Sequence, residues 1–247
     1  MRQISSTKWR KGTLSSLSRW SLKLFVFFFG CSNGSNPEAK SLINNLLAIK
    51  VDTVSTFSDR KRVLTRNYAA KHYGKDTYLM DQPKMIVVHH TVIPTLKRTI
   101  QLFKQDLLSK KRKHIGQFSK LNVGIHYVVD KDGAIYHLLA DSIMARHIVG
   151  FNHVSIGIEN VAKNSSELTE EQVMSNALLI DHLAKKHPSI QYLIGHHEYN
   201  QKALPHYELF LALDSNYLPY DKYDPGPGFM KKLRGKLKSD YGLAFEK

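Results

Sequence analysis

MIVVHHT, at residues 85–91, is the stretch that decides the fold of this chain. Its four apolar residues follow one another without a polar break, which indicates a strand buried on both faces of a sheet. Sheets of that kind are parallel or mixed and are covered by helices. The strand ends in two histidines and a threonine, so its carboxyl end carries the polar side chains of a candidate functional site.

The segments that follow residue 91 alternate between helix and strand patterns. Residues 99–109 place apolar side chains at helical spacing, and Thr169 with Gln172 forms a capping box that opens a helix ended by Pro188. Further strands are predicted at residues 125–129, 134–138, 154–161 and 192–196. The first two of these strands flank an Asp-Gly turn and form a hairpin. This order predicts an α/β fold, a single domain whose central mixed sheet is flanked by helices.

The composition limits the kinds of protein that this chain is able to form. Of its 247 residues, 42% are hydrophobic, which is enough for a packed core and excludes wholesale disorder. There are 36 lysines and arginines against 21 acids, and the net charge of +15 suggests a polyanionic partner. No aromatic-basic stacking motif accompanies this charge, so we expect no nucleic acid partner. The single cysteine excludes an intrachain disulfide and every zinc site built on several thiolates.

The first 31 residues have the pattern of a bacterial export signal. Six lysines and arginines precede the apolar run at residues 24–30, and no acid occurs before Glu38. The run is too short to span a bilayer, which takes ~20 apolar residues. Cys31 follows it in a sequence that resembles a lipobox, so we expect residues 1–31 to be a signal peptide and Cys31 to be lipidated. The alternatives are plain secretion, or an uncleaved segment in which Cys31 has no role.

A lipidated Cys31 would place the protein in the bacterial cell envelope. We expect an exported protein held to the membrane by a lipid anchor, on the outer membrane and facing the periplasm in a Gram-negative cell. Residues 32–80 then form a flexible tether and an N-terminal extension, with helical patterns at residues 41–50 and 59–73. The main domain is expected at residues 81–235, with a C-terminal tail at residues 236–247.

Histidines and a carboxylate occur at or after the ends of predicted strands. His89 and His90 stand at the end of the first strand, His196 and His197 at the end of the last, and Asp224 lies in a loop beyond it. Two neutral imidazoles and one carboxylate suit zinc and leave a fourth position open, which is typical of a catalytic zinc site. A helical H-E-x-x-H zinc motif is excluded, because Gln201 stands where its second histidine would be.

Four short motifs occur together: VVHHT at residues 87–91, SIGIE at 155–159, IGH at 194–196 and KYDPGP at 222–227. In residues and order they resemble the zinc-dependent N-acetylmuramoyl-L-alanine amidases. This amidase type 2 superfamily includes phage amidase lysozymes and peptidoglycan recognition proteins. The resemblance covers residues 80–235 and implies an α/β domain with one zinc ion per chain at the strand ends. It also implies peptidoglycan or a muropeptide as the substrate.

The resemblance assigns roles to five residues of this chain. His89, His196 and Asp224 match the zinc ligands of the family. Glu159 matches the general base that takes a proton from the attacking water, a task that needs a carboxylate within hydrogen-bond reach of that water. Lys222 matches the cation that stabilises the developing oxyanion.

Other positions depart from the family pattern or have an open role. Ile125 stands where some members carry a catalytic tyrosine, so the chain resembles the bacterial branch that relies on the glutamate. His147 resembles a substrate-facing histidine, although Arg146 beside it replaces a tryptophan, and Thr91 is a further candidate for substrate binding. Residues 199–221 form a long insertion, which is either a lid or wall of the substrate groove or a packed surface loop.

The sequence therefore predicts an enzyme that hydrolyses the amide bond between N-acetylmuramic acid and L-alanine. The alternative is a module that holds peptidoglycan or a muropeptide without cutting it. Within the superfamily, loss of a zinc ligand makes that change, and here all three ligand positions are filled. Because neighbours on a strand point to opposite faces, only one histidine of each adjacent pair, 89/90 and 196/197, is expected to face the metal.

Overall fold

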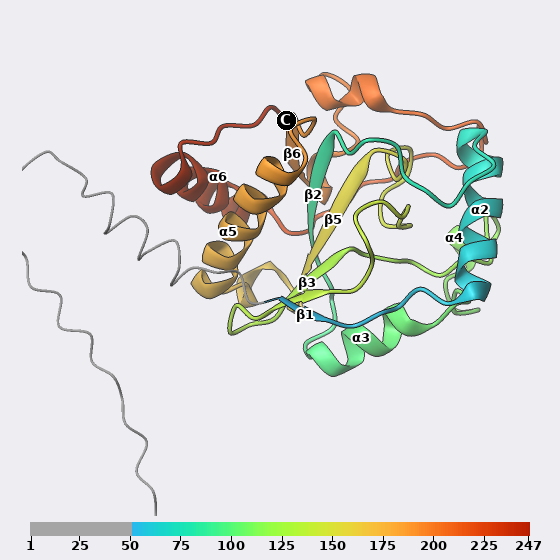
Figure 1. Ribbon diagram of the computed structural model, residues 1–247, viewed down its shortest axis with the longest axis horizontal. Coiled ribbons are helices and arrows are strands. Elements are labelled where there is room, and N and C mark those ends of the chain that lie inside the picture. Colours follow the sequence, from blue (N-terminus) through green and yellow to red (C-terminus); the bar gives the residue numbers. More distant parts are fainter. Residues whose placement is uncertain (1–50) are drawn as a thin grey trace, which may run out of the picture. The chain divides into compact units, whose positions relative to one another are not determined.

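The computed structural model describes residues 51–247, in which a central sheet lies between two groups of helices (Figure 1). The predicted signal peptide with Cys31 and the helical pattern at residues 41–50 lie outside the described residues. Within the described part, no helix is both long and apolar enough to cross a membrane. The α/β fold predicted from the sequence is confirmed.

Six strands of the described chain form one sheet in the order β1-β4-β3-β5-β2-β6. They are β1 (Val51–Thr53), β2 (Met85–His90), β3 (Tyr127–Val129), β4 (Ile135–His137), β5 (Ser155–Asn160) and β6 (Tyr192–Gly195). Every neighbouring pair is parallel except β3 and β4, which form the predicted antiparallel hairpin. The sheet is therefore mixed, as the sequence predicts.

The central position of β2 explains why MIVVHHT has no polar break. Residues 85–88 are completely buried, and β2 pairs in parallel with β5 on one side and β6 on the other. The register places His89 opposite Glu159, and the last residue of β6 directly precedes His196. Parallel strands end at the same edge of a sheet, so this edge collects the polar side chains that follow each strand.

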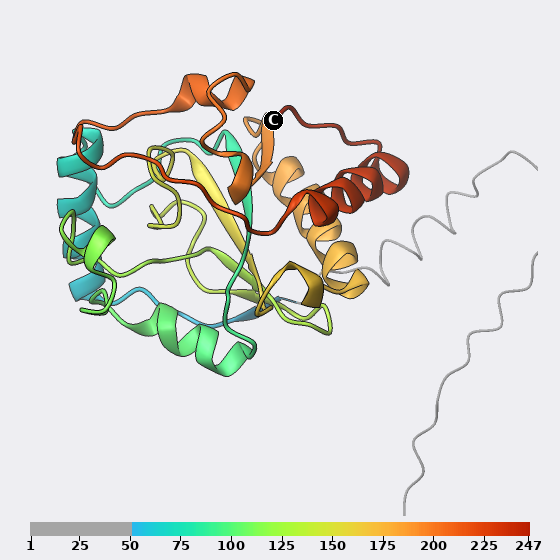
Figure 2. The same ribbon diagram turned by 180° about the vertical axis from the view of Figure 1, so that it is seen from behind.

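Helices cover both sides of the sheet (Figures 1 and 2). They are α2 (Asp59–Tyr73), α3 (Leu96–Lys104), α4 (Lys113–Gly116), α5 (Glu170–Lys186) and α6 (Pro227–Tyr241). α5 packs beside α6 on one side, and α2, α3 and α4 lie on the other. α5 begins with the predicted capping box, in which Thr169 Oγ1 accepts from the Gln172 N–H and Gln172 Oε1 accepts from the Thr169 N–H.

The helix predicted at residues 99–109 begins and ends earlier in the structure, as α3. The side-chain amide of Asn122 donates to the carbonyl oxygens of Leu102 and Gln105 and so satisfies the end of this helix. The residues that follow form a bridge to the segment at residue 121 instead of another helical turn. A long-range contact therefore overrides the local apolar spacing.

Segments outside residues 81–235 also pack against the central sheet. The described residues 51–247 belong to one compact unit, which includes segments on both sides of residues 81–235. β1 adds an edge strand beside β4, α2 buries Tyr68 and Tyr73 in the core, and α6 continues across the expected C-terminal boundary. The sequence of α2 conceals this role, because its buried face consists mainly of tyrosine, alanine, threonine and histidine instead of aliphatic residues.

Candidate metal centre

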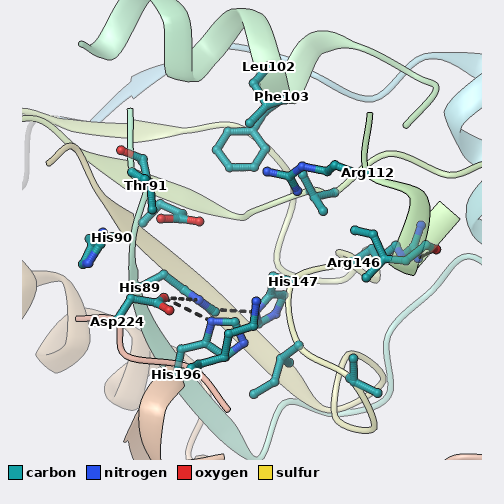
Figure 3. A pocket seen from close by; sticks show the side chains of 18 of the residues that line it. His89, His90, Thr91, Leu102, Phe103, Arg112, Arg146, His147, His196 and Asp224 are labelled. Carbon is teal, nitrogen blue, oxygen red and sulfur yellow. Dashed lines mark hydrogen bonds and ion pairs between the residues drawn. The ribbon is translucent and has the colours of Figure 1, made fainter. Parts of the chain in front are cut away.

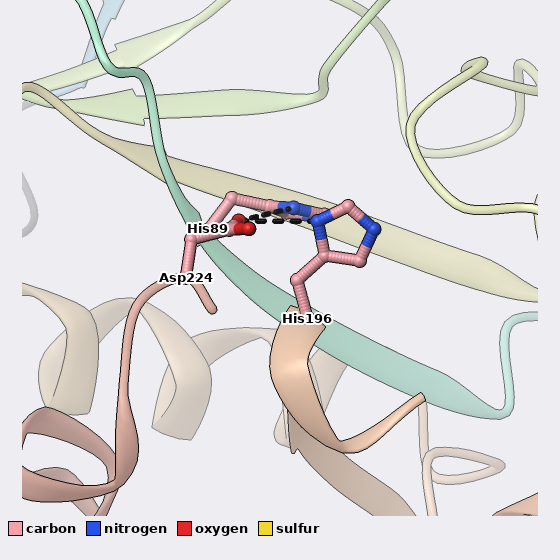
Figure 4. Close-up of side chains that lie close together, drawn as sticks. All are labelled: His89, His196 and Asp224. Atoms are coloured by element: carbon pink, nitrogen blue, oxygen red, sulfur yellow. Dashed lines mark hydrogen bonds and ion pairs between the residues drawn. The ribbon is translucent and has the colours of Figure 1, made fainter. Parts of the chain in front are cut away.

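The three predicted ligands converge at the carboxyl edge of the sheet. His89 lies near the end of β2, His196 begins a 3-10 helix after β6, and Asp224 lies in the loop before α6 (Figure 4). The Oδ2 atom of Asp224 lies 3.3 Å from Nδ1 of His89 and 3.1 Å from Nδ1 of His196. One potential ligand atom from each residue lies within 4.8 Å of the others, so the three are able to share one cation.

The protonation of this cluster suits a divalent cation. Burial, together with the neighbouring His89, lowers the pKa of His196 to about 4, so its imidazole is neutral at pH 7. Burial acts to raise the pKa of Asp224, but the two histidines beside it hold that pKa below its usual range, and the carboxylate stays ionised. A metal needs deprotonated ligands, and two imidazoles with one carboxylate form a donor set found in catalytic zinc sites.

His147 lines the pocket beside His89 and contacts its ring (Figure 3). Its Nδ1 is 3.0 Å from His89 Nε2, and its Nε2 is 3.3 Å from the carbonyl oxygen of Ser155. A proton on His147 Nε2 satisfies this carbonyl, which only accepts, with the Ser155 hydroxyl at 3.2 Å as a second acceptor; in that tautomer the Nδ1 of a neutral ring accepts from His89 Nε2–H. Burial, with the adjacent His89, keeps the pKa of His147 well below its usual value, which agrees with a neutral ring. The lone pair of His89 Nδ1 then faces Asp224.

Two further groups hold His147 in this position. The side-chain oxygen of Asn152 accepts from the backbone N–H groups of His147 and Ile148 and so orders this loop. Asn152 is held in turn from α2, because its side-chain amide donates to the Tyr68 hydroxyl. Gly157 leaves room for the ring, since a Cβ there would lie 2.8 Å from His147 Nδ1. α2, which the sequence places in an N-terminal extension, thus supports the candidate site.

Only the first histidine of each adjacent pair belongs to the cluster. His197 lies beside it and anchors the third ligand: its backbone N–H donates to the Asp224 carbonyl oxygen at 2.8 Å. Gly195 gives the His197 ring space, because a Cβ at that glycine would lie 2.6 Å from His197 Cε1. His90 lines the same pocket but is not part of the three-residue group.

Glu159 stands on β5 beside His89 and lines the same pocket as the three-residue cluster. Its Oε2 atom is buried and has no hydrogen-bond partner among the described residues. Burial, reinforced by the negative charge of Asp224, raises the pKa of Glu159 well above its usual value. A raised pKa increases the proton affinity of the carboxylate, which is the property that a general base near neutral pH requires.

Lys222 lies at the pocket wall, where the side chain of Tyr220 holds its ammonium group. Its Nζ donates to the Tyr220 hydroxyl at 2.8 Å and stands 4.2 Å from the centre of the Tyr220 ring. The two residues are separated by one position, a spacing that carries no recognisable motif. Only the path of the insertion brings the Tyr220 ring over the ammonium group.

Thr91 shapes the loop after β2 through its hydroxyl group. Thr91 Oγ1 donates to the carbonyl oxygen of Ile93 at 2.7 Å and accepts from the N–H groups of Ile93 and Ala162. These bonds hold Val92 with a φ of 58°, a left-handed conformation that costs energy for a β-branched residue. Val92 is 65% exposed and lines the pocket, a position that its sequence context did not predict.

The insertion at residues 199–221 is one wall of the pocket and is also packed against the domain. Tyr199, Tyr217 and Tyr220 line the pocket, whose empty volume of about 900 Å³ is partly open to solvent. The Tyr217 ring stacks on Phe118 at 4.4 Å between centres and meets the Tyr68 ring of α2 edge-on. The segment is therefore both a wall of the pocket and a packed surface loop, the two alternatives that the sequence left open.

Arg146 anchors the neighbouring wall and is almost completely buried. Its guanidinium donates to the carbonyl oxygens of Ile115, Leu121 and Ser119, and to the Tyr217 hydroxyl. No carboxylate of the described chain forms an ion pair with it, so its charge remains uncompensated beside the pocket. Arg146 thus fixes the backbone at residues 115–121.

Comparison with known proteins bears directly on this site. A profile of the N-acetylmuramoyl-L-alanine amidase family (Amidase_2) matches residues 79–227. The chain belongs to this amidase family. The match includes the three clustered residues His89, His196 and Asp224 as well as Glu159 and Lys222, and it begins close to the expected residue 80.

Individual proteins are also similar to this chain. The endolysins of Escherichia phage T7 and Enterobacteria phage T3 are each 32% identical to it over 96 residues, which are 36% of this chain. The aligned part spans 62% of each endolysin, less than two thirds of its length. The amidase LysCS of Clostridium intestinale URNW is 25% identical, with a TM-score of 0.43, over 66% of this chain and 89% of its own. An AmpD crystal structure is 20% identical, with the same TM-score, over 64% and 89%.

Proposed function

We propose that this chain is a zinc-dependent amidase that hydrolyses the amide bond between N-acetylmuramic acid and L-alanine in peptidoglycan. The observation that carries the proposal is the convergence of His89, His196 and Asp224 in a pocket that also holds the unpartnered carboxylate of Glu159. Membership of the amidase family supports the choice of bond. One zinc ion per chain would bind to the three clustered residues.

Zinc, when bound, supplies Lewis acidity that polarises an amide carbonyl and makes water a stronger acid. The remaining work falls to side chains of the chain. Glu159 takes the proton of the attacking water on its carboxylate and passes it to the leaving amine. Lys222 places an ammonium group at the pocket wall, where it stabilises the negative charge that develops on the carbonyl oxygen. His147 fixes the ring of His89, so that Nδ1 keeps its lone pair towards the ligand cluster.

The first test measures metal content and reaction products together. Purified protein should contain about one zinc per chain, the number that three clustered ligands are able to hold. Digests of purified cell wall, followed by mass spectrometry, should then yield stem peptides with a free L-alanine amino group, and a chelator should abolish their release. Glycan cleavage, or cleavage between amino acids, would contradict the proposal. Binding to the wall without any release of peptide would favour the alternative of a non-catalytic peptidoglycan-binding module.

We also propose that the protein is exported and anchored by lipid at Cys31, on the basis of the sequence pattern at residues 24–31. Cells expressing the wild type and Cys31→Ser would be fractionated, and the mature N-terminus of each protein analysed by mass spectrometry. An acylated cysteine at the N-terminus and membrane recovery of the wild type alone are the expected results. Equal membrane recovery of both proteins would contradict the anchor.

A further inference from the structure

One segment of the chain carries nearly all of the net charge of the described part. Residues 51–247 contain 28 lysines and arginines against 20 acids, a net charge of +8. The 25 residues from 96 to 120 contain eight of these bases against one acid, a net charge of +7. We call these eight residues the basic surface: Lys97, Arg98, Lys104, Lys110, Lys111, Arg112, Lys113 and Lys120.

All eight side chains of the basic surface are exposed, and none forms an ion pair within residues 51–247. The single acid of the segment, Asp106, instead accepts a hydrogen bond from Ser58. Bases elsewhere in the fold are often paired, such as Lys71 with Asp214 and Arg234 with Glu198. Unpaired like charges repel one another, so the basic surface costs folding energy that a bound polyanion would offset.

Five of the eight residues of the basic surface line the candidate active-site pocket or the hollows next to it. Arg112 lines that pocket, and in Figure 3 it lies beside Phe103 on the side opposite His89 and Asp224. A second hollow adjoins the pocket and is lined by Lys111 to Ile115 together with Tyr220 and Lys222. Arg112 also borders a third hollow, whose lining includes Lys110 and Lys120. A chain molecule that leaves the pocket over Arg112 therefore passes across several unpaired cations.

The side chains between these bases favour a hydrated polyanion over a membrane or a nucleic acid. Leu107, at 39% exposure, is the segment's one exposed large hydrophobic residue, whereas helices that lie in a membrane interface insert a broad apolar face. Phe103 and Phe118 are buried, so neither phenylalanine of the segment offers a ring face on which a base could stack, and the one exposed ring of the segment, His114, already meets the Tyr220 ring edge-on. An acidic polymer whose charges are spaced along its length fits this surface best.

We propose that the basic surface binds the stem-peptide carboxylates of polymeric peptidoglycan next to the stem that is being cut, which makes the intact wall polymer the preferred substrate. This proposal rests on the function proposed above and specifies the form of its substrate. A released muropeptide with a single stem fills the pocket but cannot span the surface outside it. Only a polymer makes the second set of contacts intramolecular, which raises its effective concentration.

The test uses two triple variants of the full chain with the same change in charge. Lys110→Gln/Lys111→Gln/Lys113→Gln removes three bases of the basic surface and leaves Arg112 and Lys222 in place. The matched control replaces Lys202, Lys231 and Lys238, which are exposed and form no ion pair within the described residues. For each protein, kcat/KM is measured on purified sacculi and on a soluble disaccharide peptide, at low and at high NaCl, together with co-sedimentation on sacculi.

The surface variant should lose about tenfold in kcat/KM on sacculi at low salt, the lower end of electrostatic steering effects, while the control variant retains its value. On the soluble substrate both variants should match the wild type. High salt should remove the difference on sacculi, since charges more than ~8 Å apart are screened at physiological ionic strength. Sacculi whose carboxylates have been converted to amides should bind all three proteins equally weakly, whereas removal of wall-linked phosphate polymers should leave binding unchanged.

Different failures of this experiment have different meanings. An equal loss on both substrates, or no loss on sacculi relative to the control variant, would overturn the role of the basic surface. Charge-dependent binding to anionic phospholipid vesicles or to nucleic acid, without any effect on sacculi, would overturn it in favour of that partner. If the wild type cuts neither substrate, the proposed function fails, but co-sedimentation still shows whether the basic surface holds the acidic polymer.

Discussion

Replacing His147 with alanine should weaken metal binding without removing a ligand. The substitution deletes the 3.0 Å contact between His147 Nδ1 and His89 Nε2. A neutral hydrogen bond contributes about 1 kcal/mol, which alone corresponds to roughly fivefold in affinity. The variant also frees the His89 ring to rotate and to place its proton on Nδ1. Loss of a partner of this kind typically costs ~10–100-fold in metal affinity, so we expect an effect in that range.

The assay is a competition titration of Zn²⁺ against a chromophoric chelator at fixed pH, paired with thermal unfolding with and without zinc. His147→Asn keeps an acceptor near the position of Nδ1 and should recover most of the affinity. His153→Ala is the matched control, because it removes a buried imidazole outside the pocket and should lower stability without changing zinc affinity. A folded His147→Ala protein that binds zinc as tightly as the wild type would refute the positioning role, because loss of such a partner is expected to lower the zinc affinity by at least ~10-fold.

Three further substitutions test the site and the fold. Glu159→Gln should keep zinc content unchanged while lowering kcat by at least ~100-fold, and near-normal turnover on purified wall would remove the residue from the mechanism. Gly157→Ala places a Cβ 2.4 Å from Ile125 Cδ1, so denaturant unfolding should show a loss of about 1–3 kcal/mol, and an unchanged midpoint would contradict the close packing. Burial lowers the pKa of His126 to about 4, so below pH 6.5 the unfolded chain binds a proton that the folded chain does not. The metal-free protein should therefore lose stability as the pH falls from 6.5 towards 4, and His126→Gln should reduce that slope by up to ~1.4 kcal/mol per pH unit.

The candidate ligands could be predicted because each occurs within a short local motif. His89 and His196 follow apolar runs that fit only buried strands, and parallel strands deliver their carboxyl ends to one edge of a sheet. The roles of the supporting residues could not be predicted in the same way. His147, Tyr220 and Arg146 act through contacts with segments up to 71 residues away, such as the bond between Arg146 and the Tyr217 hydroxyl. No local periodicity records contacts of this range.

The distribution of unpaired charge also could not be predicted from the sequence. The net charge of +15 indicates a polyanionic partner, but it does not tell which bases remain without a partner after folding. In the structure, bases such as Lys71 and Arg234 are neutralised by carboxylates from distant segments, while those at residues 96–120 are not. The pairing of opposite charges depends on tertiary distance, so only the fold reveals where the uncompensated charge lies.

The sequence by itself determined the mixed α/β sheet and the strand ends that carry the candidate ligands. It also determined the order of the four motifs that resemble those of the amidase family. Those features depend on hydrophobic periodicity and on short spacings, which are local properties of a chain. Tertiary structure alone decided that α2 belongs to the domain, that His147 supports His89, and that the insertion with Tyr220 forms the pocket wall. These features depend on contacts between distant segments, which form only when the hydrophobic core brings those segments together.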